Sequence, residues 1–132
     1  MKTENNSSKA LRIFLWVAQV TLSLGFIWAG ATKLFQSPQA LDEMWPWTSE
    51  NLALVKITGI LDLLAGVGLI LPALLHIVPK ITIYAAYGTI ALMIAASMFH
   101  IARGEADQIG INILFGILAI FIAWGRTRKW LS

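Results

Sequence analysis

The sequence contains no cysteine and few charged residues. The lack of cysteine excludes disulfides, thiol catalysis and thiolate metal sites. Charged residues make up 13% of the 132 residues, against about 25% in a typical soluble domain. No segment reads as a β-strand, and there is no phosphate-binding loop. What is abundant is apolar: 58% of the residues are hydrophobic and the mean hydropathy is +0.72. This composition predicts a single-domain integral membrane protein.

Four apolar segments are long enough to cross a bilayer as helices. We expect these spans at about residues 11–34, 51–71, 81–100 and 109–125, within a transmembrane domain covering 11–126. Pro72 is expected to end the second span. Residues 1–10 are polar and expected to be a flexible cytoplasmic segment, and 127–132 form a basic tail. The predicted fold class is therefore all-α, an integral membrane four-helix up-down bundle.

The placement of lysine and arginine predicts the orientation in the cell membrane. Basic residues precede the first span, lie in the 72–80 turn and follow the last span, whereas the 35–51 and 100–108 connections are net acidic. Both termini are therefore predicted to be cytoplasmic. The net charge of +3 indicates anchoring to lipid headgroups rather than binding to nucleic acid.

Asp62 lies in the middle of the second span, where a charge costs about 2.5–3.5 kcal/mol on insertion scales and more in simulations. It needs a partner, a proton or a water-filled cavity. Gly59, Asp62 and Gly66 share one helical face, and the glycines allow another helix to approach. Lys56 is a poor partner, because six residues place it about 120° and about 9 Å from Asp62. Lys33 of the first span is the better candidate.

Polar groups from all four spans gather in the outer half of the predicted bundle. The candidates for a ligand-binding site or polar cluster are Lys33, Lys56, Asp62, His100, Arg103, Glu105 and Asn112. Each also has a structural interpretation. The lysines and the arginine can reach lipid phosphates, and His100 can be a solvated residue at a helix end. Glu105 can be an ordinary loop acid, Asp62 can form a structural salt bridge, and Asn112 can join two helices by a hydrogen bond. Metal-ligand spacing is absent, and Ser97 with His100 lacks the turn of a catalytic nucleophile. We therefore expect neither a metal site nor autonomous catalytic activity.

The 35–51 connection carries Trp45-Pro46-Trp47. Indoles are common where a protein meets the membrane surface. The segment is thus either a membrane-surface anchor or a lid over a pocket.

At these positions the chain resembles the DoxX-like family of small four-span membrane proteins. The matching segments are Ala29-Gly-Ala-Thr-Lys33-Leu34, Lys56-Ile-Thr-Gly59, Asp62-Leu-Leu-Ala-Gly66-Val-Gly68-Leu69 with Pro72, His100 with Arg103-Gly-Glu105, and Asn112 with Trp124-Gly-Arg126. Family members often carry glutamate where this chain has Asp62, so any partner must come one methylene closer.

The resemblance implies a link to redox systems. The family takes its name from a membrane subunit associated with quinone reduction during sulfur-compound oxidation, and relatives are tied to redox enzyme maturation and oxidative-stress complexes. The leading hypothesis is an accessory or anchor subunit beside a redox partner protein, with a quinone-like molecule as the apolar ligand. The alternatives are a small proton-linked carrier using Asp62, which would need a homo-oligomer for an adequate pathway, and a purely structural bundle.

Overall fold

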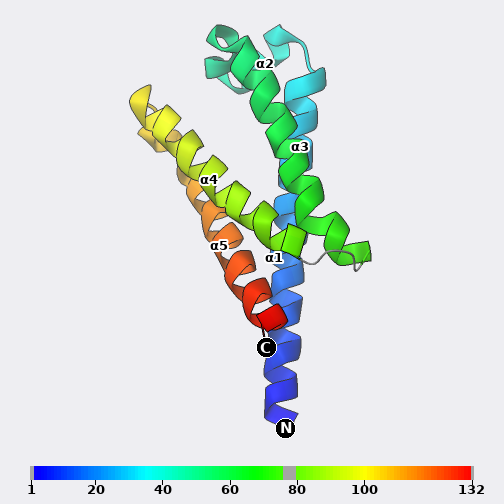
Figure 1. The fold of residues 1–132 in the computed structure, drawn as a ribbon. Coiled ribbons are helices and arrows are strands. Elements are labelled where there is room, and N and C mark those ends of the chain that lie inside the picture. Colours follow the sequence, from blue (N-terminus) through cyan, green and yellow to red (C-terminus); the bar gives the residue numbers. More distant parts are fainter. Residues whose placement is uncertain (1, 76–79, 132) are drawn as a thin grey trace.

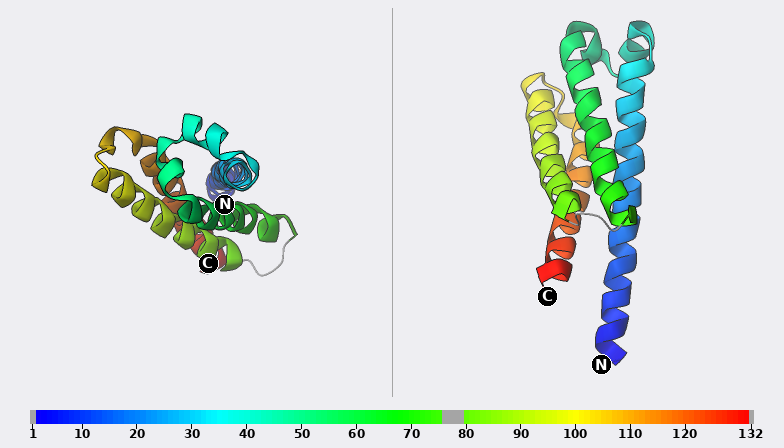
Figure 2. Two further views of the ribbon diagram at one scale, coloured as in Figure 1. Left: turned by 90° about the horizontal axis from the view of Figure 1, so that it is seen from above. Right: turned by 45° about the vertical axis from the view of Figure 1, so that its right-hand side comes forward.

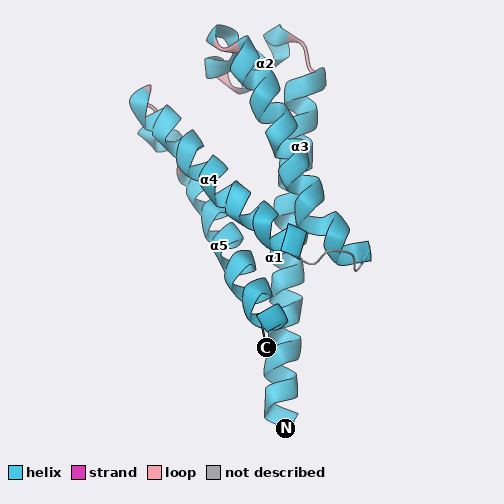
Figure 3. Cartoon of the chain, viewed as in Figure 1, coloured by secondary structure: helices cyan, strands magenta, loops and turns pink. Residues whose placement is uncertain are grey.

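The computed structural model describes residues 2–75 and 80–131, and these residues form helices, short turns and no strand (Figure 3). The long helices are α1 (Lys2–Phe35), α3 (Leu52–Leu75), α4 (Lys80–Ala102) and α5 (Gly110–Leu131). Between α1 and α3 lie a short helix, α2 (Pro38–Met44), and a 3-10 turn, η1 (Pro46–Glu50); a second 3-10 turn, η2 (Ala106–Gln108), precedes α5. Four segments meet the length and hydropathy of membrane spans: Lys9–Phe35, Leu52–Leu75, Lys80–Ala102 and Gly110–Thr127. The predicted all-α membrane bundle is confirmed.

The spans are arranged as two antiparallel pairs (Figure 1). α1 packs along α3 and α4 packs along α5, while α3–α4 and α1–α5 contacts join the pairs. We call the end that holds α2, η1 and η2 the α2 end, and the end that holds both chain termini the terminal end (Figures 1 and 2). In Figure 1 the α4–α5 pair leans away from α1 and α3 toward the α2 end.

A core of small and branched side chains joins the two pairs. Leu22, Phe26, Leu69, Ala86, Ala119 and Ile122 are buried together in it. Outside this core many large apolar side chains are exposed, among them Phe14, Leu64 and Met98. Such an exposed apolar surface suits a helix bundle whose solvent is lipid rather than water.

α1 and α3 approach closely along a line of glycines. A Cβ added to Gly30 would lie 2.7 Å from the carbonyl oxygen of Gly59, and one added to Gly66 would lie 2.7 Å from Ile27. A Cβ at Gly59 would meet the Lys33 Cβ at 3.1 Å. The predicted role of Gly59 and Gly66 in admitting a neighbouring helix is confirmed.

Two helix boundaries differ from those expected from the sequence. Pro72 is buried inside α3, which continues to Leu75, so the prediction that this proline ends the span was wrong. Proline removes one N–H, here the donor to the Gly68 carbonyl. Spans tolerate that loss because neighbouring groups can compensate for it. At the other boundary, α1 begins at Lys2 and runs through the segment expected to be flexible.

The turns at the α2 end have recognisable local causes. Ser37 caps α2, because its side chain accepts a hydrogen bond from the Ala40 N–H at 3.2 Å and Pro38 occupies the first helical position. Gly104, in the turn that follows α4, has φ +77°. Left-handed backbone of this kind favours glycine. These turns fix where the α2 end places its side chains.

Candidate ligand-binding site

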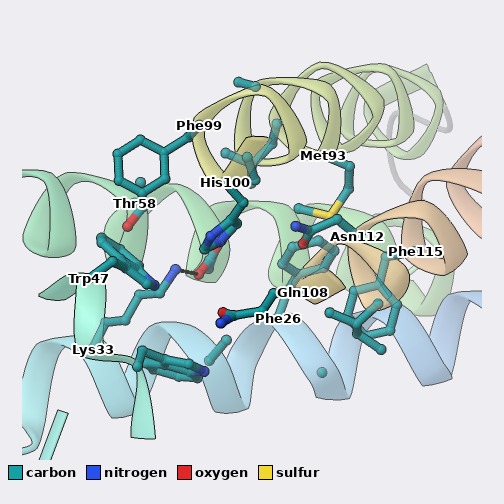
Figure 4. Close-up of a pocket in the computed structure, with 18 of the residues that line it drawn as sticks. Phe26, Lys33, Trp47, Thr58, Met93, Phe99, His100, Gln108, Asn112 and Phe115 are labelled. Carbon is teal, nitrogen blue, oxygen red and sulfur yellow. Dashed lines mark hydrogen bonds and ion pairs between the residues drawn. The ribbon is translucent and has the colours of Figure 1, made fainter. Parts of the chain in front are cut away.

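A cavity of about 670 Å³ lies in the half of the bundle nearer the α2 end (Figure 4). All four spans contribute to its walls. The lining includes Phe26, Trp28, Lys33, Trp45, Trp47, Asp62, Met93, Phe99, His100, Gln108, Asn112 and Phe115. Most of this surface is aromatic or aliphatic, with a few polar groups among it. A largely apolar cavity with a few placed polar groups is typical of a small-molecule site.

The α2–η1 connection covers the cavity at the α2 end. Trp47 is only 8% exposed and packs edge-on against Phe99, with ring centroids 5.4 Å apart. Leu41 of α2 is buried in the same cluster, and Trp45 packs against it. Since both indoles line the cavity, the structure favours the lid interpretation of this segment over the membrane-surface anchor.

Asp62 is paired with Lys33 in the cavity wall (Figure 4). The Lys33 Nζ lies 2.8 Å from the Asp62 Oδ2, which confirms the predicted partner. Asp62 is 3% exposed, so the pair balances a charge that could not otherwise remain at this depth. The same ammonium lies 5.8 Å and 5.7 Å from the ring centroids of Trp45 and Trp47. Cation–π contacts of this length hold the lysine beneath the lid.

Lys56 lies apart from the other candidates. It is exposed and does not line the cavity. Its Nζ donates to the backbone carbonyls of Leu34 and Lys33, at 3.1 and 3.4 Å. These carbonyls belong to the last turn of α1, where the carbonyl oxygens have no N–H donors within the helix. Lys56 therefore caps a helix.

An ion-pair network at the rim joins the two helix pairs. Glu105 lies 2.9 Å from the His100 Nδ1 and 3.1 Å from the Arg103 Nε, and Arg103 reaches Glu50 of η1 at 3.3 Å. Arg103 and Glu105 do not line the cavity, whereas His100 and Asn112 do. Because a carboxylate only accepts, the His100 Nδ1 carries the proton, and Nε2 is an acceptor in the neutral ring. Glu105 thus orients a histidine whose ring faces the cavity.

The rim network predicts a pH dependence. The pKa of the Glu105 carboxyl is lowered from its usual value by the hydrogen bond with His100 and by the adjacent Arg103 guanidinium. A lowered pKa means that the carboxylate stabilises the fold above its ordinary value near 4.5 and loses that effect as the pH falls through the lowered value. We expect Glu105→Gln to lower the melting temperature at about pH 7, and the difference from the parent to shrink as the pH falls through the lowered pKa of Glu105. Asp107→Asn, at an exposed acid of the same turn, is the control and should have no such pH-dependent effect. A difference for Glu105→Gln that persists at low pH would contradict the ionic role.

Several residues that line the cavity could not be identified from the sequence. Gln108 lies in η2, and Met93 and Phe115 lie on apolar stretches where periodicity does not distinguish cavity wall from core. Phe26 follows Gln19 and Ser23 at helical spacing on one face of α1, a stripe on which all three side chains are buried. That stripe was the one available signal for a bundle-facing aromatic.

These features define a class: a small four-span membrane protein with a lidded, mostly apolar cavity in one half of its bundle. The sequence matches the DoxX-like family over residues 17–122, and the chain belongs to that family. No match was found among curated proteins or among solved structures. Family membership thus agrees with the fold, and the ligand must be argued from the cavity itself.

Proposed function

We propose that this protein is an accessory membrane subunit that holds a quinone-like molecule beneath the Trp45–Trp47 lid and presents it to a redox partner protein. The observation that carries the proposal is the cavity of about 670 Å³ walled by all four spans. Sites for small ligands occupy about 300–1,000 Å³ and bury most of the ligand.

The lining matches the chemistry of a quinone head. A flat ring can lie against the aromatic walls supplied by Phe26, Trp47 and Phe115, since aromatic surfaces stack or pack edge-on. Its two carbonyl oxygens need donors, and Lys33, Gln108 and Asn112 supply N–H groups around the cavity. The polar groups are few, so an apolar ligand from the bilayer is favoured over a charged metabolite.

Electron transfer in this proposal belongs to the partner. The sequence has no cysteine, and the described residues contain no group of three or more histidine, aspartate or glutamate side chains placed to hold a metal ion. By the positive-inside rule, the basic residues near both termini favour a cytoplasmic terminal end, and we adopt that orientation in this proposal. The lid and cavity then face the opposite side of the membrane, where we place the partner.

Ubiquinone-1 binding, followed by quenching of tryptophan fluorescence, tests the proposal. Three of the six tryptophans, Trp28, Trp45 and Trp47, line the cavity, so a ligand bound there quenches part of the fluorescence. Ala96 also lines it, whereas Ala91 is exposed on the same helix. We expect Ala96→Phe to weaken binding about tenfold or more, the equivalent of about 1.4 kcal/mol, because the ring fills the ligand's space.

Ala91→Phe is the matched control and should bind like the parent, since its added ring enters lipid. Both variants should retain the parent's helical circular dichroism. Equal affinities in the two variants, or a parent that does not respond to ubiquinone-1, would refute the proposed ligand class.

A further inference from the structure

A second polar cluster lies at the terminal end, away from the cavity. Arg126, near the end of α5, is only 2% exposed. Its Nε donates to the side-chain oxygen of Gln19, and its guanidinium lies 5.3 Å from the Trp16 ring centroid. Gln19 in turn donates to the Leu69 carbonyl at 2.6 Å. The buried arginine is thus held by two side chains of α1, one of which is in turn bonded to α3.

The charge of Arg126 has no ion-pair partner among the side chains that the structure describes. Among the described side chains, 9–75 and 80–127, the ion pairs involve Lys33, His100 and Arg103, and none involves Arg126. Within that described part of the chain, three buried side-chain atoms have no hydrogen-bond partner: Arg126 Nη2, Thr82 Oγ1 and Thr127 Oγ1. Thr82 opens α4 and Thr127 follows Arg126 on α5, so all three lie toward the terminal end. An unpaired buried guanidinium is costly unless an anion joins it.

We propose that Arg126 is the centre of a phosphate-binding site at the terminal end of the bundle. A phosphate supplies the missing negative charge and accepts from a guanidinium N–H and from hydroxyls. The same chemistry is offered by the headgroup of an anionic phospholipid and by free phosphate. Arg126 stands at the end of the span Gly110–Thr127, which is the depth of lipid headgroups. Basic pockets between spans at a membrane surface bind such headgroups, and the long arginine stem lets Nη2 turn toward one.

Native mass spectrometry of the protein from nanodiscs that contain phosphatidylglycerol and phosphatidylcholine tests this site. We expect the parent to retain phosphatidylglycerol selectively and Arg126→Gln to retain about tenfold less. The loss of one charge-assisted hydrogen bond to the phosphate accounts for a change of this size. Arg12→Gln removes the same charge from an exposed position on α1. It should retain the lipid like the parent.

Inorganic phosphate separates the two sources of the anion. If phosphate displaces the lipid from the parent and raises the melting temperature of the parent but not of Arg126→Gln, the site takes free phosphate. If the lipid stays bound in phosphate, the headgroup is the ligand. Either result supports the site. Equal lipid retention by Arg126→Gln and Arg12→Gln, with no phosphate effect, overturns it.

A folding defect in Arg126→Gln would not hide the answer. Arg126→Lys keeps the charge but loses the planar fork, and it should retain an intermediate amount of lipid. The parent alone must also prefer phosphatidylglycerol over phosphatidylcholine, and a parent without that preference contradicts the proposal.

Discussion

Replacing Asp62 with leucine while Lys33 is kept should destabilise the bundle by about 3–5 kcal/mol, the usual cost of removing one member of a buried ion pair. The Lys33 side chain is only 14% exposed and its Nζ lies 2.8 Å from Asp62 Oδ2. Without the carboxylate, the Lys33 ammonium still contacts the indoles of Trp45 and Trp47 but has lost its counter-charge. Unfolding in a denaturing detergent titration, followed by circular dichroism, measures the change.

The double substitution Lys33→Met with Asp62→Leu is the matched control. It removes both charges and leaves apolar groups of similar size, which is often neutral or stabilising. We therefore expect the double variant to recover most of the stability that Asp62→Leu loses. A single variant as stable as the parent would show that the pair contributes nothing to the fold. A double variant as unstable as the single would show that packing, not charge, is what Asp62 provides.

Gly30→Ala should cause the second large loss of stability. The new Cβ would lie 2.7 Å from the Gly59 carbonyl oxygen and 3.0 Å from the Leu63 backbone nitrogen. Backbone atoms cannot turn aside as a flexible side chain can, so α1 and α3 must separate. Overpacking of this kind costs about 1–3 kcal/mol. The same detergent titration measures it.

Gly88→Ala should change the stability in the opposite direction, and it serves as the control. Nothing lies within 4 Å of a Cβ at Gly88 in α4, and alanine favours a helix interior by about 0.8–1.0 kcal/mol over glycine. We expect a small gain in stability there. If Gly30→Ala and Gly88→Ala both stabilised the protein, the close approach of α1 and α3 would be contradicted.

The fold was predictable because the four spans are stretches of apolar residues that lipid requires to be helical. The Lys33–Asp62 pair was predictable for a related reason. An acid at bilayer depth restricts its partner to the few charged groups at the same level, and helix geometry disfavours Lys56. Hydropathy and helical period were therefore sufficient to predict the architecture and one contact between helices, the Lys33–Asp62 pair.

The rest depends on tertiary packing, which periodicity does not describe. Lys56, like Lys33, is a lysine near the end of a span. It caps α1 because α3 begins beside the last turn of α1. Arg126 directly precedes the basic tail and has the sequence character of its residues, and only the packing of α1 against α5 buries it. The lid also depends on tertiary packing, because an indole suits a membrane surface and a cavity roof equally well.

The cavity belongs to neither helix pair alone: α1 and α3 supply Phe26, Lys33 and Asp62, while α4 and α5 supply Met93 and Asn112. A molecule bound there touches both halves of the chain, so its affinity is thermodynamically linked to their association. At a free concentration one hundred times its dissociation constant, such a ligand would add about 2.7 kcal/mol to the cohesion of the halves. The stability of this protein in a membrane would then report how much of the ligand the membrane holds.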